Sequence, residues 1–383
     1  MEEIVITGMA RTPMGGFQGD FARVPAAELG AAAIRTALNG LDPEAVGEVV
    51  MGCVLPAGQG QAPARQAALK AGLPLSAGAT TVNKMCGSGM KAAMLAHDLL
   101  RAGSADVVVA GGMESMSMAP YLLPKARAGY RMGHGEVKDH MFLDGLEDAY
   151  DKGRLMGTFA EDCAEAYRFT REAQDDFALA SLARAQKAIA EGWFRAEITP
   201  VGEVDTDEQP GKARPDKIPT LRPAFRKDGT VTAANASSIS DGAAALMMMT
   251  AAEAGARGLT PIARVVGHAT HAQEPAKFAT APIGAIRKLF ARTGWTAADV
   301  DLFEINEAFA VVTMAAMRDL NLDHDRVNVH GGACALGHPI GASGARVLVT
   351  LLAALRTHGL RRGVASLCIG GGEATAMAVE LIP

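Results

Sequence analysis

Apolar and polar positions repeat one order of elements in two places along the chain. The stretch "TTVNKMCGSGMKAAMLAHDLLRAGSADVVVAGGMES" predicts a turn, a helix that begins around Gly87, and the apolar strand "ADVVVAGG". Near the other end, "RVNVHGGACALGHPIGASGARVLVTLLAALRTHGLRRGVASLCIGGGEATA" predicts a strand at "VN", a glycine-rich turn, a helix from Ala345, an apolar strand and a Gly-Gly turn. The chain therefore contains one supersecondary unit twice.

Each copy is followed by another short apolar run, "AAALMMMT" in the first and "TAMAVELI" in the second. These runs complete two similar, mostly parallel sheets with helices between the strands, which is typical of an α/β protein. We expect one half at 1–118, completed by about 237–258, and a second half at 259–383. Duplication of one ancestral unit is the simplest explanation.

The segment between the copies, 119–236, differs in composition from both halves. It is charged and turn-rich at its ends, and its centre has a helical period at Phe177, Leu179, Ala180, Leu182 and Ala183. A long insertion of this kind usually covers a site. We therefore expect an inserted loop domain over the functional site.

Composition and charge exclude several classes of protein. The formal net charge is −5 with both signs interspersed, so neither nucleic acid nor an anionic membrane is expected as a partner. No uncharged apolar run reaches the roughly 20 residues that span a bilayer. The opening "MEEIVITGMARTP" is unlike a presequence, and we expect a cytoplasmic location.

The five cysteines form no CxxC pair, so the sequence predicts free thiols and no metal site. Cys86 stands directly before the helix start at Gly87, where backbone N–H groups and the helix dipole should lower its pKa and make it a nucleophile. The alternative is a small buried residue in a tight turn. His338 occupies the corresponding turn of the second copy and is a candidate base or, alternatively, a capping residue.

Two further positions stand at strand ends, where open α/β sheets expose functional groups. Cys368 ends "GVASLC" and enters "IGGGEA", and its thiol either moves protons or is buried at the strand end. Asn306 follows the strand "VDLFE" and either holds a water or an oxyanion, or caps a helix.

Four blocks, "NKMCGSGMKA", "NEAFA", "GGACALGHPIGASG" and "CIGGGEA", together resemble the signature blocks of the thiolases in order and spacing. The resemblance implies the thiolase fold: two duplicated βαβαβαββ halves in α-β-α-β-α layers with an inserted loop domain. It makes Cys86 the acyl-accepting nucleophile, His338 its base and Cys368 the acid/base at the substrate α-carbon. It also places a water held by Asn306 and His338 in one oxyanion hole, and the N–H groups of Cys86 and Gly370 in another.

The resemblance implies coenzyme A and acyl-CoA as substrates, with no prosthetic group. The residues expected to contact coenzyme A are Ser237 at the pantetheine, Lys212 and Arg214 in the loop segment where the family meets the adenine and phosphates, and Met156 and Phe309. The alternative for the two basic residues is a solvated charged loop. The glycines around His338 would let a thioester and a pantetheine arm approach the backbone. The expected activity is thiolysis of 3-ketoacyl-CoA and the reverse condensation, through an acyl-cysteine.

Alternatives to this activity are an acetoacetyl-CoA-specific acetyltransferase, a decarboxylating ketoacyl synthase and a noncatalytic binding subunit. Leu155 stands where acetoacetyl-CoA thiolases commonly have histidine, which favours a broader acyl range. Phe278 stands where the family often has methionine, and its ring should shorten the acyl pocket. The family also implies a dimer through the N-terminal half, and "PKARAGYRMGHG" resembles the loop that joins two dimers into a tetramer.

Overall fold

The first half of the chain forms a five-stranded portion of a larger sheet. The computed structural model describes residues 2–382. Its strands follow the order β4-β3-β5-β8-β1. Their bounds are β1 (Ile4–Arg11), β3 (Glu48–Gly52), β4 (Gly78–Val82), β5 (Val107–Ser115) and β8 (Ser240–Thr250), and a short β2 (Gly15–Gly16) pairs with β8.

The second half repeats this order as β10-β11-β12-β9. Its strands are β9 (Ala263–Ala272), β10 (Leu302–Ile305), β11 (Arg362–Ile369) and β12 (Glu373–Leu381). Val327 forms a parallel bridge with Phe303 on β10, at the place where β4 pairs with β3 in the first half. The matching order confirms the duplication read from the sequence.

The strand predicted at "VN" is reduced to this bridge. Asn328 has φ of 50°, which turns the chain away from the sheet edge. Its side chain accepts from Ile305 N–H at 2.8 Å and donates to Ile305 C=O at 2.8 Å, bonds that a strand's backbone would otherwise make. Two side-chain hydrogen bonds of Asn328, to a residue 23 positions away, have replaced the ladder.

The expectation of two similar, mostly parallel sheets is wrong in two respects. Strands β5 and β8, β8 and β1, β11 and β12, and β12 and β9 all pair antiparallel. The turn between β11 and β12 is three glycines long, and so short a connection can join only antiparallel strands. The halves are also continuous, because Val5 and Ile6 of β1 pair with Arg264 and Ala263 of β9.

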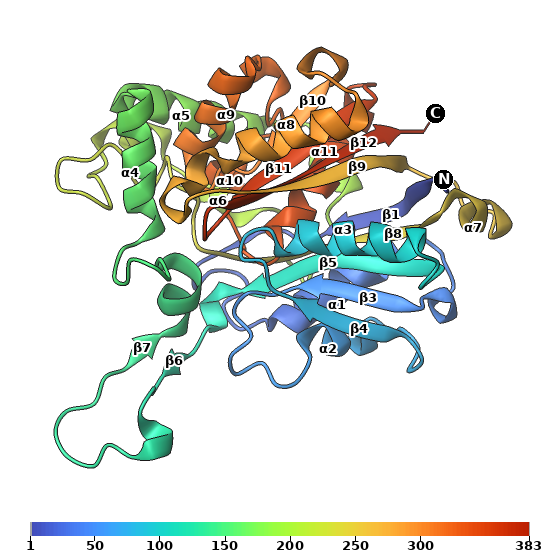
Figure 1. Ribbon diagram of the computed structural model, residues 1–383, viewed down its shortest axis with the longest axis horizontal. Helices are drawn as coiled ribbons and strands as arrows, with labels where there is room; N and C mark the ends of the chain where they lie inside the picture. Colours follow the sequence, from blue (N-terminus) through green and yellow to red (C-terminus); the bar gives the residue numbers. More distant parts are fainter. Residues whose placement is uncertain (1, 383) are drawn as a thin grey trace.

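Helices separate the two halves of the sheet into layers, as Figure 1 shows. The central layer is α3 (Ser88–Arg101) packed on α11 (Ser343–Thr357), and their apolar residues form one buried core with both sheet portions. The outer layers are α1 (Ala26–Ala37) with α2 (Pro63–Lys70), and α8 (Ala281–Thr293) with α9 (Ala310–Leu320). The α-β-α-β-α arrangement is therefore confirmed.

The segment 119–236 leaves the first half after β5 and returns at β8. It contains a two-stranded ribbon of β6 (Tyr121–Leu122) and β7 (Lys138–Asp139), and then α4 (Met156–Tyr167), α5 (Arg171–Ala190) and α6 (Glu208–Lys212). The predicted helical period falls on α5. The ribbon and its tip project from the body of the molecule at the lower left of Figure 1. Assignment of the segment as a separate domain stays a prediction.

A buried arginine fastens this segment to the first half. Arg11 at the end of β1 donates to Asp207 Oδ1 at 2.7 Å and Oδ2 at 2.9 Å, and to Glu197 Oε1 at 2.5 Å. All three side chains are excluded from solvent.

Short helices α7 (Ala251–Ala256) and α10 (Ala333–Leu336) complete the fold, and no described helix has the length and apolarity that crossing a membrane would require.

Candidate active site

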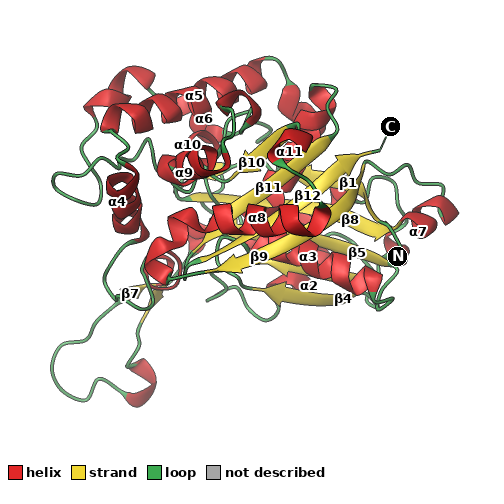
Figure 2. Ribbon diagram, turned by 45° about the horizontal axis from the view of Figure 1, so that its top comes forward, coloured by secondary structure: helices red, strands yellow, loops and turns green. Residues whose placement is uncertain are grey.

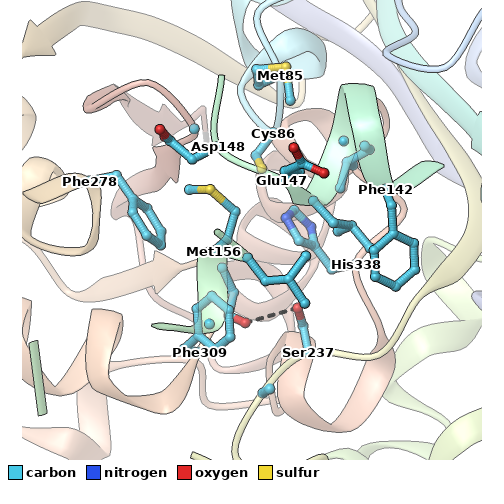
Figure 3. Close-up of a pocket in the computed structure, with 18 of the residues that line it drawn as sticks. Met85, Cys86, Phe142, Glu147, Asp148, Met156, Ser237, Phe278, Phe309 and His338 are labelled. Carbon is cyan, nitrogen blue, oxygen red and sulfur yellow. Dashed lines mark hydrogen bonds between the residues drawn. The ribbon is translucent and has the colours of Figure 1, made fainter. Parts of the chain in front are cut away.

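A cavity of about 580 Å³ opens between the two halves and the inserted segment. Its wall includes Cys86 from the first half, His338 and Cys368 from the second, and side chains of α4. Figure 3 shows the Cys86 thiol close to the His338 ring, with Met156, Phe278 and Phe309 along the cavity. The fold thus brings together three of the candidate residues from both copies of the duplicated unit.

Cys86 is presented by a strained turn. Met85 before it has φ of 46°, and α3 begins two residues later at Ser88, with Gly87 as its N-cap. Desolvation raises the pKa of the Cys86 thiol to about 11. The backbone N–H groups of Gly370 and Cys86 favour the thiolate and lower the pKa, but by less. The expectation of a lowered pKa is wrong because burial outweighs those N–H groups. A base is therefore needed to form the thiolate.

His338 has the protonation that such a base requires. Ser343 Oγ donates to Pro339 C=O at 3.0 Å, so it accepts a hydrogen bond from His338 Nδ1 at 2.6 Å. The proton therefore sits on Nδ1, and the lone pair of Nε2 is free; Nε2 is buried without a hydrogen-bond partner among the described residues. Burial lowers the pKa of His338 to about 3, which keeps the ring neutral.

Asn306 lies behind His338 rather than on the cavity wall. Its Nδ2 is 3.4 Å from His338 Nδ1, and its Oδ1 accepts from Arg346 Nη2 at 3.2 Å. Arg346 is itself held by Glu304 at 2.9 Å, and both side chains are buried. This chain of contacts fixes the orientation of the Asn306 amide.

Cys368 is the second thiol of the cavity. It lies at the end of β11 and is buried. Burial, and then the neighbouring charge of a Cys86 thiolate, raise its pKa well above the ordinary range of a thiol. Cys368 therefore holds its proton at rest.

The space left by the missing side chains of the glycines near His338 is filled by other atoms of the protein. A Cβ on Gly341 would lie 2.6 Å from Glu114 Oε2, and one on Gly344 would lie 2.3 Å from Met90 N. Added side chains at Gly331, Gly332 and Gly337 would likewise meet protein atoms within 2.5 Å. The prediction that these glycines admit the substrate is therefore wrong.

Glycines that do face open space follow Cys368. A Cβ on Gly370 would find its first neighbour at 3.8 Å, and Gly371 has no atom within 4 Å of that position among the described residues. Both line the cavity. The explanation by close ligand approach fits this turn instead.

Two family models together match almost the whole chain. The N-terminal domain of thiolases matches residues 4–252 and the C-terminal domain matches residues 259–381. The chain belongs to the thiolase family. Its thiolase fold is that of a crystal structure of a thiolase from Ascaris suum in complex with coenzyme A, with a TM-score of 0.95 and 40% identity over 100% of both chains.

Named relatives agree with this membership. An acetyl-CoA acetyltransferase of Pseudomonas aeruginosa is 51% identical over 98% of this chain and 99% of its own. One of Cupriavidus necator is 50% identical over 99% and 100%, and acetyl-CoA acetyltransferase 2 of Arabidopsis thaliana is 50% identical over 99% and 97%.

Of the residues expected to contact coenzyme A in this thiolase, the structure brings three to the cavity: Ser237, Met156 and Phe309. Ser237 Oγ donates to Ala308 C=O at 3.0 Å, a bond drawn in Figure 3. Lys212 is instead paired with Glu208, and Arg214 is exposed; neither belongs to the cavity wall. The Glu208 carboxylate therefore competes with the phosphates of coenzyme A for the Lys212 ammonium.

Sequence reasoning missed two residues of this thiolase site. Ser343 sets the tautomer of His338, and its position five residues after His338, at the start of the helix that follows "HPIGA", is the signal that could have found it. Phe225 packs edge to face on Phe309, with ring centroids 5.9 Å apart, and lines the cavity. Nothing in the charged stretch around Phe225 marks it as part of a pocket.

Proposed function

We propose that this thiolase is an acyltransferase that cleaves 3-ketoacyl-CoA with coenzyme A and runs the reverse Claisen condensation. The observation that carries the proposal is the pair of protonated thiols, Cys86 and Cys368, in one cavity with a neutral imidazole whose Nε2 is free. The coenzyme A in the Ascaris suum structure and the names of the relatives support it.

In thiolysis, His338 Nε2 takes the proton of Cys86, and the thiolate attacks the 3-keto carbon. The C2–C3 bond then breaks; its electron pair forms the enolate of acetyl-CoA, which takes the proton of Cys368 at carbon. The acyl group stays on Cys86 as a thioester. Coenzyme A attacks that thioester, gives its proton to Cys368, and leaves as the shortened acyl-CoA while His338 returns the proton to Cys86.

Two oxyanions form in this sequence and need separate donors. The N–H groups of Cys86 and Gly370, which already favour the Cys86 thiolate, would serve the oxyanion on the acyl carbon. A water held by Asn306, together with protonated His338, would serve the enolate oxygen. The backbone donors are in place before the substrate arrives, whereas His338 becomes a donor only after it has taken the proton of Cys86.

Two other functions are less well supported. A noncatalytic binding subunit would have no need of both thiols and an orphaned imidazole nitrogen in one cavity. A decarboxylating ketoacyl synthase would need no acid/base thiol at the Cys368 position. Thiolysis rates across a chain-length series of 3-ketoacyl-CoA, with condensation measured alongside, test the proposal, and an enzyme inactive with every member would contradict it.

The acyl range is the finer part of the proposal, and we assign its limit to Phe278. Phe278 is buried between Phe159 and Phe309, with ring centroids 6.5 and 6.3 Å away, and it lines the cavity. The names of the relatives point to acetyl groups. Leu155, also on the wall, favours the broader range proposed from the sequence.

Replacing Phe278 with methionine should lengthen the accepted acyl chain. A buried methylene is worth about 1 kcal/mol, so each further carbon pair should gain up to roughly 30-fold in thiolysis efficiency until the pocket ends. The chain-length profile of kcat/KM measures this. Leu155→His is the matched change: if it narrowed the profile while Phe278→Met left it unaltered, the limit would lie with Leu155.

We also propose that the protein assembles as a dimer of dimers. Strand β4 is an edge strand with an open ladder, which suits a dimer through the N-terminal half. The projecting ribbon carries exposed apolar side chains, among them Met132 at 96% and Val137 at 59% exposure. Such side chains mark an interaction surface.

Light scattering should therefore give the mass of four chains. Met132→Asp with Val137→Asp should give the mass of two, because the charges oppose burial of the ribbon tip. A parent mass of two chains across a broad concentration range would rule out the tetramer.

A cytoplasmic location remains part of the proposal and is supported by five free cysteines, which suit a reducing compartment.

A further inference from the structure

Two histidines and an aspartate meet where the two halves adjoin, outside the catalytic cavity. His97 and Asp98 lie on α3, and His268 lies on β9, 171 and 170 residues away along the chain. Figure 2 shows α3 running beside β9. His97 Nδ1 is 3.1 Å from Asp98 Oδ1, His268 Nε2 is 3.0 Å from the same oxygen, and the two ring nitrogens are 3.2 Å apart.

These three atoms form a nearly equilateral triangle. Ligand atoms bound to a tetrahedral ion at about 2.0–2.1 Å stand about 3.3 Å from one another, so the triangle matches one face of such a site. Hydrogen bonds alone satisfy it poorly: if both imidazoles donate to Asp98, two N–H groups face each other at 3.2 Å. A cation above the centre of this face would accept all three lone pairs.

The surroundings leave the three groups able to bind. Besides Asp98 and His97, the charged group that acts on His268 is Lys91 of α3. The two histidines are mostly buried, at 11% and 13% side-chain exposure, whereas Asp98 is 54% exposed. The opening beside Asp98 leaves room for a water as fourth ligand. Lys91 is the charge that opposes a cation here.

We propose that His97, Asp98 and His268 bind a divalent transition ion of the zinc type. Imidazole nitrogen and carboxylate oxygen are ligands that zinc accepts, and the sequence could not indicate the site because its members are not close along the chain. The ion would join α3 of the first half to β9 of the second. Its effect would be on cohesion of the halves, since none of the three residues belongs to the catalytic cavity.

Titration of chelator-treated full-length protein with Co²⁺ and Zn²⁺ tests this. We expect one ion per chain, with visible cobalt absorption but no near-ultraviolet thiolate-to-cobalt band, which distinguishes the site from the cysteines. His268→Gln and Asp98→Asn should weaken binding by more than the roughly 10–100-fold that loss of a group hydrogen-bonded to a metal ligand costs. His134→Gln, at an exposed loop histidine, is the matched control and should bind as the parent does.

Thermal unfolding provides a second measurement. An ion that binds the folded state alone raises the midpoint in proportion to the logarithm of its concentration. Zn²⁺ should therefore raise the midpoint of the parent and of His134→Gln, and leave that of His268→Gln unchanged. Failure of the parent to bind either ion, binding that persists in both ligand variants, or a thiolate band would overturn the proposal and leave a hydrogen-bonded cluster.

Discussion

Cys86→Ala should abolish acyl transfer, whereas Cys368→Ala should still accept an acyl group and fail to condense it. Cys86 supplies the sulfur that holds the acyl group, so its loss should lower thiolysis by roughly 10⁴-fold or more. Cys368 moves a proton to and from carbon, which transfer of an acyl group from acyl-CoA to Cys86 does not require. Mass spectrometry after incubation with labelled acetyl-CoA separates the two roles.

Cys334→Ala is the matched control, because Cys334 is a free cysteine outside the cavity wall. It should keep both the label on Cys86 and the condensation rate. A label found on Cys368, or on no cysteine of an active enzyme, would contradict the assignment. Equal loss of acylation in both active-site variants would show that acyl acceptance and proton transfer are not assigned to different thiols.

The second large effect is expected from a single methyl group at the contact of α3 with α11. In Gly344→Ala the new Cβ would lie 2.3 Å from Met90 N and 2.9 Å from Met90 Cβ, so the two helices must separate. Overpacking of this kind costs up to about 3 kcal/mol of unfolding free energy. Displacement of the turn that carries His338 by about 1 Å relative to Cys86 should also lower kcat roughly 100-fold.

Gly255→Ala makes the same chemical change in another helix. Its Cβ meets no described atom within 4 Å, so helix propensity alone acts and the variant should gain up to about 1 kcal/mol. Urea unfolding and steady-state rates measure both variants. If Gly344→Ala were as stable and active as the parent, the close contact of the helices would not be what sets the geometry.

Much of the fold could be predicted from the sequence because its signals are local. The helix expected around Gly87 begins at Ser88, and the helix expected at Ala345 begins at Ser343, since small residues at a helix start resemble a turn. The strand at "VN" failed for a non-local reason: Asn328 bonds a residue 23 positions earlier. Apolar pattern carries no information on such a partner.

The candidate site was predictable as a set of residues but not in its electrostatics. Cys86, His338 and Cys368 all reach the cavity, yet the pKa of Cys86 moves opposite to the prediction because burial is decided by the whole fold. The pairing of Lys212 with Glu208 was likewise invisible, although the two are four residues apart, because many such pairs stay solvated. In the same way, the sequence shows the glycines near His338 but not that protein atoms, rather than substrate, occupy the space beside them.

The repeated strand order has a consequence for how this catalyst could have arisen. Cys86 and His338 occupy equivalent turns of the two copies, one before α3 and the other before α11. A single-copy ancestor that assembled as a twofold pair would have presented identical side chains from both turns. A nucleophile opposite a different residue as its base became possible once one gene encoded both turns and each could mutate alone. Fusion of the two copies thus allowed one turn to carry the nucleophile and the other turn to carry the base.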